Sequence, residues 1–324
     1  LRRISEKGSK GFYEGEVADD IISSLSKIGG EHTLEDLSNV TVEYVKPIKE
    51  DFGDYQLFEI PPNGQGVTAI LMRKILEKFK ISNLDPMGAE RVHLEAEAAK
   101  IAYDVRNNLV ADQRFYQFDP EAFYSDEIVD KYANMINRDK VLDLKFIQNE
   151  AIHKDTVYLT VIDKDRFIIS LIFSIFNSFG SGYASEKFGL LFHNRGAGFS
   201  LKKDHPNELY GGKRPFHTII PAFLTKKSDF TMPFGVMGGQ YQANGHARLI
   251  SNIIDFPRSF PEEGYLKIEE GYSDNITSQL SQMGHNIFKP KQPIGGAQAI
   301  ICDHVSDTLT AGSDPRKDGC ALGY

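Results

Sequence analysis

Cysteine is scarce in this sequence, because its 324 residues include only two, Cys302 and Cys320. Two cysteines do not make a disulfide framework, and this favours a reducing compartment. We therefore expect a cytoplasmic protein. The chain starts at Leu1 and not at a methionine, so we expect an upstream part to be missing, together with any signal peptide.

Several other signals are absent. No run of about 18 apolar residues occurs, so no membrane span is expected. The formal net charge is −8, which argues against nucleic acid as the main partner. The nine histidines are scattered, and the sequence shows neither an HExxH nor a CxxC spacing, so we expect no metal site and no cofactor. Neither an internal repeat nor a low-complexity tract is visible.

What the sequence does contain is an ordinary globular balance, with 41% hydrophobic and 25% charged residues. Apolar side chains recur every three or four positions in the segments that we expect to be helices. These are residues 12–28, a short segment capped by Thr33, and residues 67–79, 88–110, 125–136, 238–254 and 274–283. Apolar runs predict strands at 40–45, 55–60, 158–162, 167–173, 189–192, 219–224, 231–234, 297–302 and 308–311. Helices, then mixed strands, then helices indicate an α+β or layered α/β fold.

One stretch, residues 155–182, suggests a particular chemistry. Two apolar strands are joined by a charged turn at residues 163–165, and the first strand opens on Thr156. A polar run, residues 138–154, lies just upstream. Cleavage before Thr156 would free its α-amine to act as the base for its own Oγ, which is what an N-terminal nucleophile hydrolase needs.

A second candidate feature is the pair Gly238-Gly239, between a predicted strand and a predicted helix. Glycine lets the main chain approach a substrate closely. Two N–H groups at a helix N-terminus can face a developing negative charge. A Gly-Gly pair alone is usually only a turn, so its position between strand and helix carries the functional interpretation.

Ordered landmarks along the chain resemble a known family. They are GFYEG at 11–15, LEDL at 34–37, PPNGQG at 61–66, HLEAEA at 93–98, FGSG at 179–182, GKRP at 212–215, the glycine pair at 238–239, SDPRKDG at 313–319 and ALGY at 321–324. Together they resemble the gamma-glutamyltransferase (gamma-glutamyltranspeptidase) family, and the resemblance covers nearly the whole chain.

The resemblance implies an α+β fold, a four-layer αββα sandwich of the N-terminal nucleophile hydrolase type. It implies a zymogen that cleaves itself into two subunits. Residues 1–155 would then be the C-terminal part of a large subunit, with a cleavable linker near 138–155. Residues 156–324 would be the small subunit of 169 residues (324 − 155), and both parts would form one intertwined domain. The two subunits of the precursor would be each other's partners, and a homo-oligomer stays open.

The resemblance also implies catalytic roles. Thr156 aligns with the nucleophile, which first attacks the preceding carbonyl and then the substrate amide. Gly238 and Gly239 align with the glycines of the oxyanion hole, and Ser174 aligns with a hydroxyl residue that holds the nucleophile's amine or Oγ. Residues 157–158, Val-Tyr, depart from the Thr-His of many members.

The pocket positions depart most from the family. The substrate-binding candidates are Phe176, Asn194, Arg195, His217 and Thr218. Gly198 replaces the acidic group that holds the substrate's α-amine, whereas Arg195 brings a guanidinium that can bind a carboxylate in a bidentate fork. His217 and Thr218 replace a Ser-Ser pair, and Phe176 replaces an Asn and is interpreted as an apolar pocket wall. An alternative role for Arg195 is a structural salt bridge.

We therefore expect an N-terminal threonine amidohydrolase that hydrolyses, or transfers, gamma-glutamyl groups such as that of glutathione through an acyl-threonine intermediate. The altered pocket also suits a carboxylate-bearing acyl group without an α-amine. One alternative is accordingly a glutaryl or cephalosporin-type acylase. A second alternative is a non-catalytic binding protein that retains the fold. The expected partner is a small gamma-glutamyl or related acyl amide.

Overall fold

The computed structural model describes residues 1–143, 154–256, 272–287 and 295–323. The chain divides into two units, which are described separately. The first comprises Leu1–Val45, Ile152–Asp155 and Ser174–Arg195, and the second comprises Lys46–Ala151, Thr156–Phe173 and Gly196–Tyr324. Each unit takes residues from both sides of the predicted cleavage position.

The second unit is built on a six-stranded antiparallel sheet with the order β1-β2-β5-β6-β7-β8. Its strands are β1 (Ile48–Phe52), β2 (Tyr55–Glu59), β5 (Ala222–Lys226), β6 (Phe230–Met237), β7 (Gly296–Asp303) and β8 (Thr308–Ser313). The central strand β6 is buried from Met232 to Val236. A central strand of this kind is covered on both faces.

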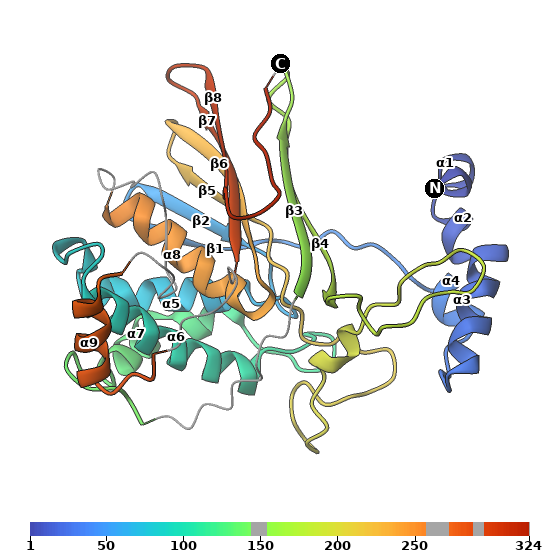
Figure 1. The fold of residues 1–324 in the computed structure, drawn as a ribbon, viewed down its shortest axis with the longest axis horizontal. Coiled ribbons are helices and arrows are strands. Elements are labelled where there is room, and N and C mark those ends of the chain that lie inside the picture. The colour runs from blue at the N-terminus through green and yellow to red at the C-terminus, as the bar shows by residue number, and fades with distance from the viewer. Residues whose placement is uncertain (144–153, 257–271, 288–294, 324) are drawn as a thin grey trace. The chain divides into compact units, whose positions relative to one another are not determined.

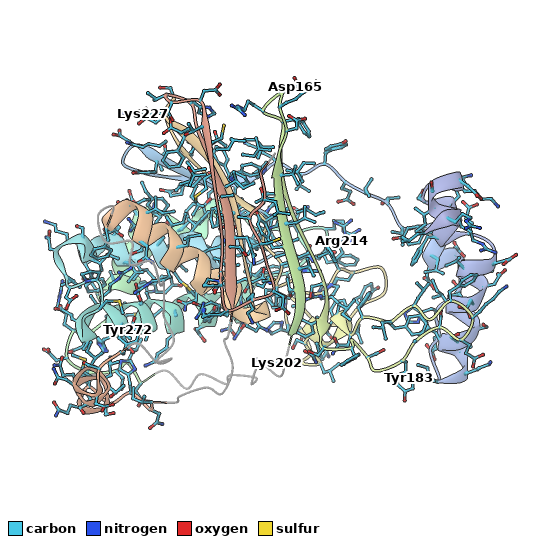
Figure 2. All side chains as sticks on the ribbon, turned by 45° about the horizontal axis from the view of Figure 1, so that its top comes forward. Asp165, Tyr183, Lys202, Arg214, Lys227 and Tyr272 are labelled. Atoms are coloured by element: carbon cyan, nitrogen blue, oxygen red, sulfur yellow. The ribbon has the colours of Figure 1, made fainter. Side chains whose placement is uncertain are left out.

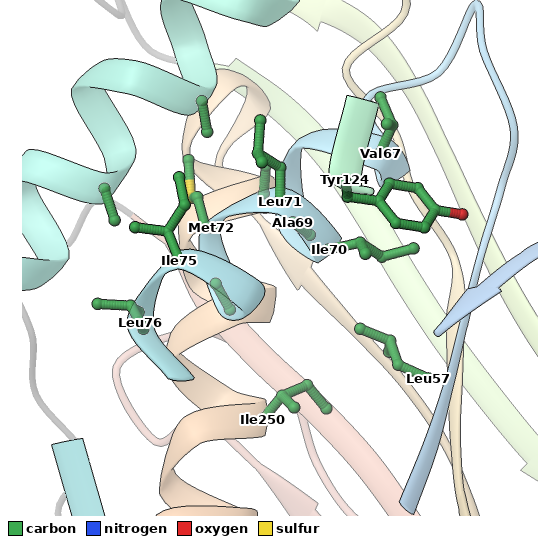
Figure 3. Close-up of a cluster of buried hydrophobic side chains, with 14 of the residues drawn as sticks. Leu57, Val67, Ala69, Ile70, Leu71, Met72, Ile75, Leu76, Tyr124 and Ile250 are labelled. Carbon is green, nitrogen blue, oxygen red and sulfur yellow. The ribbon is translucent and has the colours of Figure 1, made fainter. Parts of the chain in front are cut away.

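Helices cover one face of this sheet (Figure 1). Helices α5 (Gly66–Lys78) and α8 (Gln242–Asp255) lie against its strands. Helices α6 (Ala89–Leu109) and α7 (Asp126–Ala133) pack on α5, and α9 (Asp274–Gln282) packs on α6. The 3₁₀ turns of this unit are η1 (Ile81–Asn83), η2 (Pro120–Tyr124) and η4 (Gly239–Tyr241). Helix α5 is buried almost all round, and its apolar side chains meet Leu57 of β2 and Ile250 of α8 in the core (Figure 3). Among the described residues, no helix has both the length and the apolar character needed to cross a membrane.

The other face of the six-stranded sheet carries a two-stranded sheet, β3 (Lys154–Ile162) and β4 (Ile168–Asn177). Its inner side lies directly on the larger sheet. Ser170 Oγ donates to the carbonyl of Ala222 at 3.3 Å, and the ring of Tyr158 lies against Gly235, where a Cβ would overlap the ring. Phe234, the neighbour of Gly235, faces α8 instead, with its ring 4.7 Å from that of His246. Helices, a large sheet and a small sheet are therefore stacked in order, which confirms a layered mixture of helix and sheet.

The described helices of the first unit are α1 (Arg2–Lys7), α2 (Lys10–Tyr13), α3 (Glu16–Lys27) and α4 (Leu34–Ser38). The predicted cap of α4 is confirmed, because Thr33 and Asp36 form a reciprocal capping box. The carboxylate of Asp20 on α3 accepts hydrogen bonds from the backbone N–H groups of Lys187 (2.9 Å) and Phe188 (3.0 Å). These bonds hold α3 to the segment after β4.

Three strand predictions need correction. Residues 40–45 form no strand: Val42 is 95% exposed, and within the described residues no partner strand offers the backbone hydrogen bonds that a strand requires. Residues 189–192 contribute only an isolated bridge between Ala184 and Leu191. The strands β3 and β4 were expected inside a covered sheet, but within the described chain their outer face is exposed, for example at Leu171 and Phe173 (45% and 53%).

Candidate active site

Thr156 lies near the start of β3 and is half-buried. Side chains alternate along a strand, so Thr156 shares a face with Tyr158, the residue that packs on Gly235 of β6. The hydroxyl of Thr156 is therefore on the side of β3 that faces the large sheet. Val157, next to it, is 48% exposed on the opposite side.

Contacts at the far end of the strands show which end of the large sheet Thr156 approaches. Arg166, in the turn between β3 and β4, forms an ion pair with Asp307 in the turn between β7 and β8. At that end Asp303 of β7 pairs with Phe230, the first residue of β6. The β3–β4 turn and the β5–β6 turn lie at the same end in Figure 2, where Asp165 and Lys227 mark them. Thr156 therefore lies at the opposite end, where β6 finishes.

The pair Gly238-Gly239 follows immediately after β6 at this same end. Gly238 has φ 131° and Gly239 has φ 57°, both positive, and a residue with a Cβ rarely adopts such angles. Gly239 also begins the turn η4 that leads into α8, so the backbone N–H groups here belong to a helical N-terminus. The structure thus brings a threonine hydroxyl and a glycine turn to one end of the two packed sheets.

Gln65, from the PPNGQG loop, holds this glycine turn in place. Its Nε2 donates to the carbonyl of Gly239 at 3.0 Å and to the carbonyl of Thr218 at 2.7 Å. Its Oε1 accepts from Arg106 Nη1 at 2.8 Å. Gln65 is fully buried, so these bonds form without competition from solvent.

Arg106 on α6 completes the support. Its guanidinium lies 4.4 Å from the ring centroid of Tyr103 and 4.8 Å from that of Phe216. Burial lowers the pKa of Arg106 to about 10, which still leaves the group charged at neutral pH. The Tyr103 hydroxyl donates to the carbonyl of Gln240 at 2.7 Å. We did not predict Gln65 or Arg106, and the one signal for Gln65 was its place between two glycines of the motif.

The predicted residues His217 and Thr218 dock against the same loop. The backbone N–H of His217 donates to the carbonyl of Asn63 at 2.9 Å, and the Asn63 side chain donates to the carbonyl of Pro215 at 2.6 Å. Thr218 is 1% exposed. Five predicted site residues therefore belong to the second unit: Thr156, His217, Thr218, Gly238 and Gly239.

The other four predicted residues, Ser174, Phe176, Asn194 and Arg195, belong to the first unit. Asn194 Oδ1 accepts from the N–H of Asn177 at 3.0 Å, and Ser174 Oγ accepts from the N–H of Phe176 at 2.9 Å. The Arg195 guanidinium lies 4.4 Å from the centroid of the Phe176 ring. Arg195 is 5% exposed, and burial lowers its pKa to about 10. The structure thus brings the predicted apolar wall and the predicted cation together.

Comparison with known proteins assigns the chain to a family. A family model described as gamma-glutamyltranspeptidase matches residues 1–324. The chain belongs to this family. The glutathione hydrolase-like YwrD proenzyme of Bacillus subtilis (strain 168) is 30% identical over 342 residues, and the oxamate amidohydrolase proenzyme of Klebsiella pneumoniae is 28% identical over 343 residues. The predicted resemblance to gamma-glutamyltranspeptidases is confirmed.

The solved structures agree with the family assignment. The crystal structure of cephalosporin acylase from Bacillus halodurans has a TM-score of 0.86 to this chain at 32% sequence identity, over 100% of this chain and 62% of that one. Each of the two curated matches likewise covers 100% of this chain and 64% of the relative. The chain therefore spans less than two thirds of the length of the gamma-glutamyltranspeptidase relatives that it matches.

Proposed function

We propose that this chain carries the nucleophile of an N-terminal threonine amidohydrolase, with Thr156 as the attacking residue. The observation that supports this proposal is the arrangement of Thr156 at the start of β3, at the same end of the packed sheets as Gly238-Gly239. A nucleophile and backbone N–H donors at one place are what acyl transfer requires. Relatives that are named proenzymes are consistent with activation by cleavage.

Maturation would begin when Thr156 Oγ attacks the carbonyl carbon of Asp155. The peptide C–N bond breaks, an ester forms to Oγ, and the nitrogen becomes the α-amine of Thr156. Water then hydrolyses this ester and releases residue 155 as a carboxylate. The chain would thereby divide into residues 1–155 and 156–324, the two subunits of one precursor. The two subunits would share the large sheet, because β1 and β2 precede Thr156 and β5 to β8 follow it.

In the mature protein, the free α-amine of Thr156 would accept the Oγ proton as Oγ attacks a substrate amide. The N–H groups of Gly238 and Gly239 would stabilise the oxyanion. Removal of one such donor typically lowers kcat by a factor of about 10²–10³. The α-amine then gives its proton to the leaving amine, and water hydrolyses the acyl-threonine. Gln65 would keep the glycine turn in place during both steps. No step requires a cofactor.

The acyl group bound in this way would be gamma-glutamyl, as in glutathione, or a glutaryl-type group. By the family resemblance, we assign the acyl carboxylate to Arg195, with Phe176 as an apolar wall and Asn194 and Ser174 as polar contacts in the same unit. The same resemblance assigns substrate contacts to His217 and Thr218 of the second unit. The stacking of Arg195 on Phe176 combines a cation with an apolar surface. Gly198 stands where the family has the acidic residue that holds a substrate's α-amine. Both features favour the second candidate, a glutaryl or cephalosporin-type acylase. The similarity to cephalosporin acylase supports the same candidate.

We also propose that a further helical layer covers the outer face of β3 and β4, which would complete the four-layer αββα sandwich. Six large apolar side chains are exposed there: Val157, Leu159, Val161, Ile169, Leu171 and Phe173. An apolar sheet face of this size is normally buried. A hydrophobic dye should bind strongly to residues 1–324, and Leu171→Lys should weaken that binding; a protein that binds no dye would contradict the proposal.

Denaturing mass spectrometry tests the proposed function. After prolonged incubation the wild type should give two fragments, the second beginning at Thr156, whereas Thr156→Ala should stay whole. Thr160→Ala, which changes the next threonine on the same face of β3, should still cleave. Cleaved protein is then compared on gamma-glutamyl and glutaryl p-nitroanilides. A wild type that remains whole would oppose the enzyme assignment and favour the non-catalytic binding protein.

A further inference from the structure

A cluster of metal-binding side chains lies in the helical layer, in the second unit. His93 and Glu97 are on α6, four residues apart, so they share one helix face. His285 comes from the segment just after α9. One ligand atom from each of the three residues lies within 4.8 Å of both others. His93 and Glu97 are fully buried, and His285 is half-buried.

The hydrogen bonds around His93 orient it as a ligand. Its Nε2 lies 2.7 Å from the carbonyl oxygen of Asn137. A carbonyl only accepts, so Nε2 carries the proton and Nδ1 presents a lone pair. That Nδ1 faces His285 Nε2 at 2.7 Å. A metal-bound histidine commonly has this second hydrogen bond, which fixes the ring and its tautomer.

Glu97 supplies the carboxylate of the cluster. Its Oε2 accepts from the backbone N–H of Leu142 at 2.6 Å, and its Oε1 accepts from Lys100 Nζ at 2.6 Å. Each carboxylate oxygen has a further lone pair that can face a cation. The Lys100 side chain is 27% exposed, so it can leave toward solvent when another cation arrives.

We propose that His93, Glu97 and His285 bind one Zn²⁺ ion, or a divalent transition metal with the same ligand preference. Two imidazoles and one carboxylate are typical zinc ligands, and water would take the fourth position. Tetrahedral bonds of about 2.0–2.1 Å separate two nitrogen ligands by roughly 3.3 Å. The two facing imidazole nitrogens, 2.7 Å apart, must therefore move apart by about 0.6 Å. His285 is half-buried and lies outside a helix, so it can make this movement and shift its proton to Nδ1.

The proposed ion would act as a clamp. Asn137 and Leu142 are hydrogen-bonded to two of the ligands, and Val141 donates to the carbonyl of Met283 at 3.1 Å. Zn²⁺ would therefore join α6, the residues after α9 and the segment 137–142. Local sequence spacing could not reveal this site, because 192 positions separate His93 from His285. The inference does not depend on the proposed amidohydrolase activity.

Metal binding to the purified full chain tests the proposal. After treatment with a chelator, the wild type should take up one Zn²⁺ per chain, measured by competition with a chromophoric chelator, and Co²⁺ should give a tetrahedral visible spectrum. Loss of an outer hydrogen-bond partner typically weakens metal binding about 10–100-fold. His285→Gln and Glu97→Gln each remove a direct ligand, so each should weaken Zn²⁺ binding by more than this. Lys100→Met should strengthen it, because a competing positive charge is removed.

Matched controls separate this site from other metal ligands. His32→Gln alters an exposed histidine and Cys320→Ser removes the exposed thiol, and both variants should bind Zn²⁺ as the wild type does. Zn²⁺ should also slow amide exchange at Leu142. Binding that is unchanged in both His285→Gln and Glu97→Gln, or no uptake by correctly folded wild type, would overturn the proposal. A fall in affinity in Lys100→Met would do so as well.

Discussion

Gln65 offers a sharp test of how the glycine turn is held. Replacing it with methionine keeps the approximate volume but removes the two bonds to the carbonyls of Thr218 and Gly239 and the bond from Arg106. Each neutral bond contributes about 1 kcal/mol and a bond to a charged group about 1.5–3 kcal/mol. We therefore expect Gln65→Met to lower the free energy of unfolding by about 4 kcal/mol, measured by urea titration.

A second variant at Gln65 tests the position of the glycine turn separately from the stability of the fold. Gln65→Glu keeps an acceptor for Arg106 but turns an acceptor oxygen toward the two carbonyls, so the glycine turn should shift. A misplacement of about 1 Å can cost about 10²-fold in rate. We expect kcat to fall by roughly this factor with little change in KM, because the proposed oxyanion contact strengthens only in the transition state.

Gln56→Met serves as the control, because Gln56 makes its hydrogen bond to Asp51 at an exposed position. It should change neither stability nor kcat by a measurable amount. Equal stability of the Gln65→Met and Gln56→Met variants would refute the energetic reasoning. A Gln65→Glu variant with reduced stability and full kcat would refute the positioning role.

Two further predictions concern sheet packing and acid stability. Gly235→Ala places a methyl group against the Tyr158 ring and should cost about 1–3 kcal/mol, and a double-mutant cycle with Tyr158→Val should show strong coupling. Burial raises the pKa of Asp112, but hydrogen bonds from the Arg114 side chain and from backbone N–H groups lower it overall to about 2 from 3.8. This depressed folded-state pKa contributes about 2 kcal/mol above pH 4, which is lost as the pH falls from about 4 to 2. Asp112→Asn should flatten the stability profile in that window; unchanged acid unfolding would contradict it.

The sequence predicted elements best where local pattern and tertiary contacts agree. Residues 40–45 alternate as a strand should, yet they lie outside both sheets because none of the strands in the described part of the chain pairs with them. Strand β1 has the sequence IKEDF, and only its two end residues are buried. It therefore lacks the alternation of apolar and polar residues from which a strand is predicted. Helix α5 was predicted from one apolar stripe, but it is buried on nearly all sides because other helices surround it.

The candidate site likewise contains residues that local patterns predict and residues that only long-range contacts reveal. Thr156 and Gly238-Gly239 were predicted as site residues because a strand opening and a strand-to-helix turn are local patterns, and the family resemblance reinforced them. The bonds from Gln65 join residues 153 and 174 positions apart, and no local pattern records such pairs. The same holds for Glu59 and His246, fully buried residues 187 positions apart whose side chains lie 2.7 Å from each other. Contacts of this kind, made by side chains across the fold, could be identified only in the structure.

Strand β6 connects these observations. Gly235 lets the Tyr158 ring lie directly on β6, which sets how closely β3 approaches the large sheet. Strand β6 ends two residues later, at Met237, and Gln65 holds the glycine turn that follows it through a hydrogen bond to the carbonyl of Gly239. The separation between the Thr156 hydroxyl and the glycine N–H groups therefore depends on one close contact and one buried amide. A side chain at position 235 should accordingly disturb the proposed chemistry before it unfolds the protein.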